Sequence, residues 1–391
     1  MADKDDAHFL HRRPDLRIIG LLSLGHLCVD TNSGALSAIL PFIKAAQGLS
    51  YSAVGLLVLV TNATSSLTQP LFGYLADRHA RRWMLPLSLC LAGAGMGLVG
   101  LVHSYGAVMF LLVVMGLGVA AYHPEGYRAA ADSSGGRLAT GLSWFSVGGN
   151  IGVALGPPMI TYLVVTHGMG GSIGMAVPCL VIALLLLHVR ARLGGPVARM
   201  RPAGAQATAK SRPGAMVLLI LLVTVRSWTH LGFSTYIPFY YIDYLGAGPQ
   251  QVALLLFVFL GAGAVGTLIG GPLADRWGAK RFIVWAFVFS APLAMLFLKT
   301  GGNLAFLFLA LFGAVSVATF TTTVVLGQAY LPRNPGMASG LIVGFAIGTG
   351  GVAVMLLGRI ADAYGVPAVL WLAASMPIAG LAMAALLPRP H

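Results

Sequence analysis

The chain has 391 residues, of which 57% are hydrophobic and only 9% are charged, whereas a soluble globular domain carries roughly 25% charged residues. Its Lys and Arg residues outnumber its Asp and Glu residues by 24 to 11, which gives a net charge of +13. These figures exclude a soluble globular protein and predict a polytopic membrane protein, in which the basic residues mark cytoplasmic loops and not a nucleic-acid surface.

Apolar segments bounded by Pro, Gly and charged residues predict twelve membrane-spanning helices, each of which needs about 20 residues to cross the bilayer. The predicted spans are 17–43, 51–75, 83–102, 106–127, 138–166, 173–191, 214–242, 251–274, 281–299, 303–330, 336–361 and 367–387. Most Lys and Arg residues fall in alternate connections, which places both termini and the central connection in the cytoplasm. We therefore expect an all-α polytopic membrane protein.

The first predicted span carries a polar face. His26, Asp30, Ser33 and Ser37 recur at helical spacing and share one side of the helix. A charge at the centre of a membrane costs on the order of 3 kcal/mol even on mild scales, so it needs a partner or a water-filled cavity. We interpret Asp30 as the proton carrier of a transport cycle and His26 as a substrate contact. The alternative is a structural carboxylate with one permanent partner.

A charged loop follows the second span and recurs after the eighth. The first copy, Gly73-Tyr-Leu-Ala-Asp77-Arg78, returns 198 residues later as Gly271-Pro-Leu-Ala-Asp275-Arg276. A repeat at half the chain length predicts two related six-helix bundles, 1–191 and 214–391, joined by a flexible cytoplasmic linker, 192–213. The charges can pair across each loop and with helix ends, or they only fix the topology. The candidate residues of these loops are Gly73, Asp77, Arg78, Arg82, Asp275, Arg276 and Lys280.

The fourth span holds the only glutamate of the chain. Glu125 follows His123 and Pro124 and precedes Arg128 by one helical turn. The related positions of the second half are uncharged, and coupling or substrate chemistry explains such a one-sided cluster better than packing does. We predict that Glu125 and His123 take part in proton coupling, with Arg128 as the charge partner. Whether Glu125 pairs with Arg128 or with His123 is open.

The fifth span has a face almost without side chains. Gly148, Gly152 and Gly156 recur every four residues and are followed by Pro157. Small residues at this spacing let two helices approach closely, so we expect a helix-packing motif. Asn150 on the same span is a candidate substrate contact, although hydrogen bonding between helices explains it as well.

Arg226 lies in the seventh span, where the repeat relates it to the position beside Asp30. We expect the two charges to attract one another in one state of the transporter, and protonation of Asp30 to free Arg226 for an anionic substrate group. His230 follows one turn later on the same face, and Tyr236 lies further along the span. We interpret Arg226, His230 and Tyr236 as substrate contacts, with interfacial anchoring as the alternative for the tyrosine.

The three cysteines, Cys28, Cys90 and Cys179, lie within apolar runs and lack the spacing of metal ligands. We read them as small buried hydrophobic residues, and we expect neither a disulfide nor a zinc site. No metal is predicted elsewhere in the chain.

Twelve spans, a central linker and a charged loop after spans 2 and 8 resemble the major facilitator superfamily over nearly the whole chain. The first loop matches that family's pattern except that Ala80 replaces its later glycine, and the resemblance implies that the loops latch one conformation. The glycine face of span 5 resembles the antiporter motif, although Met159-Ile160 replaces the usual glycine pair. This partial match favours export.

Three further elements are similar to the fosmidomycin resistance protein branch of that superfamily, which consists of bacterial drug exporters. They are Gly25-His26-Leu-Cys-Val-Asp30, Tyr122-His123-Pro124-Glu125-Gly126 and Ser146-Val-Gly148-Gly149-Asn150. The resemblance implies fosmidomycin or similar phosphonate-like compounds as one substrate.

We therefore expect proton-coupled efflux of small toxic compounds by alternating access, or, as the alternative, proton-coupled uptake of a small organic anion. The sequence holds no nucleophile elbow, phosphate loop or metal-ligand spacing, so we expect that the protein is not an enzyme and has neither a cofactor nor an ATP site. We expect the proton gradient to be its energy source. The expected partners are the substrate, protons and the lipid bilayer, without nucleic acid. We expect a monomer in the bacterial inner membrane.

Overall fold

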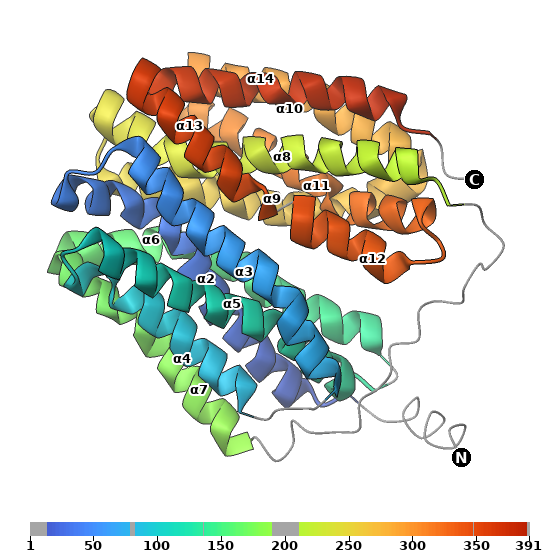
Figure 1. Ribbon diagram of the computed structural model, residues 1–391, viewed down its shortest axis with the longest axis horizontal. Coiled ribbons are helices and arrows are strands. Elements are labelled where there is room, and N and C mark those ends of the chain that lie inside the picture. Colours follow the sequence, from blue (N-terminus) through green and yellow to red (C-terminus); the bar gives the residue numbers. More distant parts are fainter. Residues whose placement is uncertain (1–13, 79–82, 136, 190–210, 347, 389–391) are drawn as a thin grey trace. The chain divides into compact units, whose positions relative to one another are not determined.

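The computed structural model describes residues 14–78, 83–135, 137–189, 211–346 and 348–388, and every regular element within these ranges is a helix (Figure 1). The elements up to residue 189 are α2 (Leu16–Gln47), α3 (Tyr51–Arg78), α4 (Met84–Gly97), η1 (Val99–Leu101), α5 (Tyr105–Ser133), α6 (Leu138–His167), η2 (Met169–Met175) and α7 (Ala176–Val189). The later elements are α8 (Pro213–Phe239), η4 (Tyr240–Tyr244), α9 (Pro249–Trp277), α10 (Ala279–Lys299), α11 (Gly302–Tyr330), α12 (Pro335–Ser339), η5 (Gly340–Ala346), α13 (Gly350–Tyr364) and α14 (Val366–Leu386). The predicted all-α fold is confirmed.

Eleven helical stretches within the described ranges are long and apolar enough to cross a membrane. The helix α2 is not among them: its 32 residues are long enough, but His26, Asp30 and Asn32 interrupt its apolar sequence. Together with α2, the eleven stretches correspond to the twelve predicted spans. Only 28% to 61% of each apolar stretch is buried, so each leaves the apolar outer surface that contact with lipid requires.

Local sequence signals place most helix boundaries close to their predicted positions. The Ser104 hydroxyl accepts a hydrogen bond from the Ala107 N–H at 3.3 Å and caps the start of α5. Pro213 and Pro249 occupy the first turns of α8 and α9, where the missing N–H costs no helical bond. Gly365 ends α13 with a φ of 82°, a conformation that favours glycine.

The chain forms two compact units, and their boundary crosses two helices. The first unit comprises Met1–Leu36 and Thr64–Met200, and the second comprises Ser37–Ala63 and Arg201–His391. The C-terminal part of α2 and the beginning of α3 thus belong to the second unit. Most of the predicted linker, 192–213, lies outside the described residues, and the division into 1–191 and 214–391 stays a prediction.

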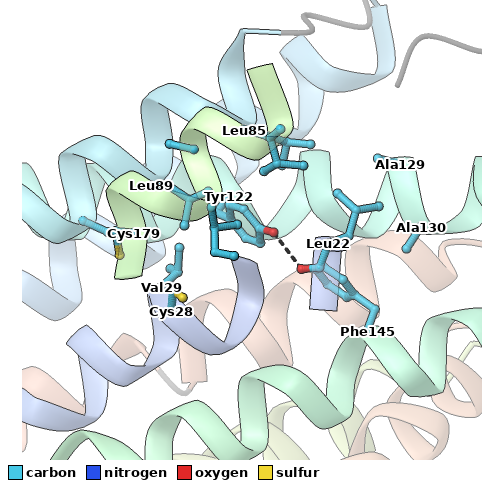
Figure 2. Packing of buried hydrophobic residues seen from close by; sticks show 14 of the residues in the cluster. Leu22, Cys28, Val29, Leu85, Leu89, Tyr122, Ala129, Ala130, Phe145 and Cys179 are labelled. Atoms are coloured by element: carbon cyan, nitrogen blue, oxygen red, sulfur yellow. Dashed lines mark hydrogen bonds between the residues drawn. The ribbon is translucent and has the colours of Figure 1, made fainter. Parts of the chain in front are cut away.

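The core of the first unit joins α2, α4, α5, α6 and α7 around fully buried aromatic rings. Tyr122 and Phe145 have no exposed surface and pack with Leu22, Val29 and Leu89, as Figure 2 shows. The Tyr122 hydroxyl donates a hydrogen bond to the Leu22 carbonyl oxygen at 2.7 Å, so the ring is buried without an unpaired polar atom. This core fixes the middle of α2 against α5.

The core of the second unit is a separate cluster. It includes Leu219 and Leu222 of α8, Ile283 of α10, Tyr330 of α11 and Ile342 of η5. The Tyr330 hydroxyl donates to the Pro388 carbonyl oxygen at 2.6 Å. The buried tyrosine again has its polar atom satisfied by the backbone.

The glycine face of α6 lies directly against α2. A Cβ atom at Gly148, Gly152 or Gly156 would overlap with backbone atoms of Ser23, Leu27, Thr31 or Ala35. The approach is reciprocal, because a Cβ at Gly34 would overlap with the Val153 carbonyl oxygen. Because glycines on both helices have no side chain, the two backbones lie in contact, which is how small residues pack helices together in membranes.

We expect Gly156→Ala to lower the unfolding temperature of the purified protein, because the added methyl group has no space beside the Thr31 carbonyl oxygen and the Ala35 N–H. Overpacking of this kind costs roughly 1–3 kcal/mol. The matched control is Gly106→Ala in the first turn of α5, where a Cβ meets nothing within 4 Å. Thermal unfolding in detergent compares the two, and equal unfolding temperatures would contradict the close approach.

Candidate functional site

The polar face of α2 meets α5 inside the first unit. Asp30 lies between two imidazoles: His26 Nε2 is 3.2 Å from Asp30 Oδ2, and His123 Nε2 is 3.5 Å from Asp30 Oδ1. His26 is 3% exposed and Asp30 is 8% exposed. We call these three residues the His–Asp–His triad. It gives the buried carboxylate the partners that a charge inside a membrane requires.

Both imidazoles of the triad are oriented by backbone carbonyls. His26 Nδ1 lies 2.9 Å from the Phe145 carbonyl oxygen, and His123 Nδ1 lies 2.8 Å from the Val119 carbonyl oxygen. A carbonyl oxygen can only accept, so each Nδ1 carries the proton and donates it. In the neutral form of each ring the Nε2 lone pair therefore points towards Asp30. The next proton that the triad binds would therefore lie between an Nε2 atom and the Asp30 carboxylate.

Aromatic side chains surround the triad. His26 stacks on Phe145 with ring centroids 4.3 Å apart and meets His123 edge to face at 4.9 Å. Tyr127 meets Phe145 edge to face, with ring centroids 4.8 Å apart. These rings exclude water from most of the triad, but the His123 side chain remains 22% exposed and gives access from one side.

The structure answers the open question about Glu125. The Arg128 Nε donates to Glu125 Oε2 at 3.1 Å, and Arg128 Nη2 makes a second bond to Glu125 Oε1. Arg128 Nη1 also reaches Asp132 Oδ2 at 2.7 Å, so one guanidinium joins two carboxylates. Glu125 pairs with Arg128, and His123 belongs to the triad.

Arg226, in the second unit, is 8% exposed although it lies in the middle of α8. Its Nη1 donates to Thr319 Oγ1 at 3.1 Å, and its guanidinium lies 5.7 Å from the centre of the Phe320 ring. A small pocket opens beside it, lined by polar and apolar side chains. The lining residues are Arg226, Thr229, Ala286, Phe287, Ser290, Phe312, Val315, Ser316, Thr319 and Pro377.

The charge of Arg226 has no carboxylate partner within the described part of the second unit. That unit holds Asp243, Asp275 and Asp362, of which Asp243 and Asp362 bind the start of α3 and Asp275 is exposed at the end of α9. The predicted Asp30–Arg226 pair joins residues of different units and stays a prediction. Within its own unit, Arg226 is a buried cation that faces hydroxyl groups and aromatic rings, a setting suited to an anionic group.

The other predicted substrate contacts are not among the residues that line this pocket. His230 stacks on Phe259 at 5.0 Å, and its buried Nδ1 has no hydrogen-bond partner among the described residues. Tyr236 is fully buried, and its hydroxyl donates to the Val354 carbonyl oxygen at 2.7 Å. Asn150 is partly buried in α6, next to Gly149. His26 lies in the triad of the first unit.

The charged loops are described only in part. Arg82 and the side chains of Asp77 and Arg78 fall outside the described residues, and their latch role stays a prediction together with that of Gly73. In the second copy, Asp275 and Arg276 are exposed at the end of α9. Lys280 Nζ donates to the Ala385 carbonyl oxygen at 2.8 Å, which joins α10 to the end of α14.

The second unit also contains a polar cluster that sequence reasoning missed. Asp362, near the end of α13, accepts bonds from the backbone N–H groups of Tyr51 and Ser52 at 2.8 and 3.0 Å and so caps the start of α3. Asp243 accepts bonds from Tyr51 Oη at 2.8 Å and from Lys44 Nζ at 3.2 Å. The sequence Ser-Tyr-Ser before an apolar run signals a helix start, but the capping carboxylate comes from a residue 310 positions away.

Comparison with known proteins gives matches along nearly the whole chain. A family model described as Major Facilitator Superfamily matches residues 22–342 and 229–391. The fosmidomycin resistance protein of Escherichia coli strain K12 is 31% identical over 94% of this chain and 92% of its own length. The MFS-type transporter YfnC of Bacillus subtilis strain 168 is 32% identical over 96% of this chain and 93% of its own length.

Solved structures show the same architecture. A bacterial homologue of the human lysosomal transporter Spinster superposes with a TM-score of 0.80 at 16% identity and covers 97% of this chain and 98% of its own. The xylose transporter XylE of E. coli gives a TM-score of 0.71 at 15% identity over 96% of both chains. At these identities the superpositions concern the fold alone.

Proposed function

Because the chain belongs to the Major Facilitator Superfamily, we propose that it exports small toxic compounds, fosmidomycin-like or otherwise amphipathic, in exchange for protons by alternating access. The chain is a multi-pass membrane transporter and not an enzyme. Its relatives with export-related names include a multidrug resistance protein MdtG, 28% identical, and the quinolone resistance protein NorA, 22% identical. These names support an export direction for this chain.

Arg226 is the observation that carries the proposal. A buried guanidinium without a carboxylate partner among the described residues of its unit destabilises the fold, so its presence in the middle of a membrane helix supports a functional role. The hydroxyls of Thr319 and Ser316 lie beside it, and the buried Ser316 Oγ has no partner among the described residues. A phosphonate or carboxylate group on a substrate would satisfy both the charge and the free hydroxyl.

The triad supplies the proposed proton site. Asp30 is held by two imidazoles whose Nδ1 atoms are already bound, so protons can enter and leave only on the side that faces the carboxylate. We assign Asp30 as the principal proton carrier and His123, the more exposed imidazole, as its route to water. We assign Glu125 as a second residue that binds and releases protons during transport. No cofactor is invoked, because the proton gradient supplies the energy.

Uptake of an organic anion remains the second candidate, because the Arg226 pocket suits an anion whichever way it moves. A probable L-galactonate transporter of E. coli K12 is 28% identical over 33% of this chain. The direction of transport separates the two candidates. In the proposed setting the chain is a monomer in the bacterial inner membrane with both termini in the cytoplasm.

The direct test of export is drug accumulation in cells. Cells that express the chain should accumulate less fosmidomycin than cells with an empty vector, and a protonophore should abolish the difference. If cells that express the chain accumulate more fosmidomycin and more of the unrelated amphipathic drugs, the protein imports these compounds and the export proposal is wrong. A panel of organic anions then identifies what enters.

We expect Glu125→Gln to shift the pH dependence of transport, because Arg128 then loses the charge of one of the two carboxylates that it binds and the charge beside the triad changes. Transport rates of reconstituted protein between pH 5 and pH 8 measure the shift. The comparison is Asp132→Asn, which removes the other carboxylate of the same guanidinium. A pH profile identical to wild type for Glu125→Gln would leave Glu125 a purely structural role.

A further inference from the structure

The His–Asp–His triad has the composition of a metal site. His26, Asp30 and His123 each offer one ligand atom, and these atoms lie within 4.8 Å of one another. The sequence predicts no metal, because metal-ligand spacing occurs neither among its cysteines nor among its other residues. His123 is far from Asp30 in sequence, and only the packing of α5 on α2 brings it to the carboxylate.

We propose that the His–Asp–His triad binds one divalent transition-metal ion of the zinc class. Two imidazoles and one carboxylate suit zinc and its neighbours better than magnesium or calcium, which prefer oxygen ligands. Three protein ligands leave a fourth position of a tetrahedral ion open. The inference does not depend on the proposed transport, because metal binding needs neither a substrate nor a gradient.

The orientation of the imidazoles is the first support. Metal-bound histidines commonly donate their second ring N–H to a carbonyl or carboxylate, which fixes the tautomer and aims the other nitrogen at the ion. His26 and His123 both do this, through the Phe145 and Val119 carbonyl oxygens. Both Nε2 lone pairs thus face the same carboxylate, and a positive centre between them, a proton or a metal ion, stabilises the arrangement.

The unsatisfied nitrogen is the second support. His26 Nε2 is buried and has no hydrogen-bond partner among the described residues, although Asp30 Oδ2 lies 3.2 Å away. Ligand atoms about 2.0–2.1 Å from a tetrahedral zinc ion lie roughly 3.3 Å from each other. His26 Nε2 lies 3.2 Å from Asp30 Oδ2 and His123 Nε2 lies 3.5 Å from Asp30 Oδ1, so each imidazole is close to that edge length from one of the two carboxylate oxygens.

The backbone of α6 lies close beside the triad. Gly149 of α6 faces the triad, and a Cβ there would come within 2.5 Å of His26 Nε2 and 2.7 Å of Asp30 Oδ2. The glycine therefore keeps a side chain out of the triad. The His123 side chain is 22% exposed and the Asp30 side chain is 12% exposed, which gives a cation a way in.

The test is isothermal titration of tag-free purified protein with ZnCl₂ and, in parallel, with MgCl₂. We expect wild type to bind one Zn²⁺ and no Mg²⁺. His26→Gln and His123→Gln should each weaken zinc binding at least about 10-fold, since even the loss of an outer partner of a ligand costs that much. The matched control is His103→Gln, which changes an exposed histidine outside the triad and should leave binding unchanged.

A second measurement guards against variants that fail to fold. X-ray absorption at the zinc edge of loaded wild type should show two imidazoles and oxygen ligands around the metal. The proposal is overturned if wild type shows no saturable zinc binding, if the spectrum shows no imidazole, or if only His103→Gln weakens binding. Any of these results leaves the transport proposal standing, and failure of transport leaves the zinc titration unaffected.

Discussion

Asp30→Asn should abolish proton-driven drug transport while the protein still folds. Asparagine has the shape of aspartate but cannot take up the transported proton, and it loses the charge that holds His26 and His123. Both imidazoles can be neutral without the carboxylate, so the substitution leaves no unpaired buried charge and we expect the unfolding temperature to stay near that of wild type. Reconstituted protein with an imposed pH gradient measures the uphill transport that is lost.

The matched control for this variant is Asp15→Asn. Asp15 precedes α2 in the same unit, and its side chain accepts bonds from the Arg17 and Ile18 N–H groups at 3.2 Å, which asparagine can also do. We expect this control to transport like wild type. Full proton-driven transport by Asp30→Asn would remove Asp30 from the proton path.

Arg226→Gln should weaken the binding of anionic substrates by roughly 10- to 150-fold, the equivalent of a charge-assisted hydrogen bond worth about 1.5–3 kcal/mol. Neutral compounds of similar size should bind almost as they do to wild type. Because Arg226 is buried without a carboxylate partner among the described residues of its unit, its removal should leave the unfolding temperature unchanged or higher. Competition binding to purified protein measures the affinities.

Two further variants sharpen this prediction. Arg226→Lys keeps the charge but loses the planar fork, so its affinity for anions should lie between those of wild type and Arg226→Gln. Arg359→Gln removes an exposed arginine of the same unit and should have no effect. An equal loss of affinity for neutral and anionic compounds would assign Arg226 to packing and not to recognition of a charge.

Much of the fold could be predicted from the sequence because a membrane restricts the choice of structure. Apolar runs must become helices, and Pro, Gly and charged residues end them, so the predicted span 251–274 became α9 with small changes at its ends. The span 336–361 was harder. The structure divides it into α12, the π-helical η5 and α13, and hydropathy alone carries no signal for a change of helical type.

The candidate site was predicted in its parts but not in its pairings. The spacing of His26 and Asp30 on one helix face is local, and the structure brings the two into contact. The contact of His123 with Asp30 depends on how α5 packs on α2, which no local pattern encodes. The repeat related Asp30 to Arg226, but a repeat relates positions and does not establish contacts. The cap that Asp362 provides to α3 was missed for the same reason.

The measurement that tests the central claim most directly is proton movement in inside-out membrane vesicles whose lumen has been made acidic. Addition of fosmidomycin, and then of unrelated amphipathic drugs, should raise the luminal pH of vesicles with wild type and leave vesicles with Asp30→Asn unchanged. That result would establish drug/proton exchange through Asp30. An unchanged luminal pH across the whole drug panel, with folded wild type in the membrane, would contradict drug/proton antiport.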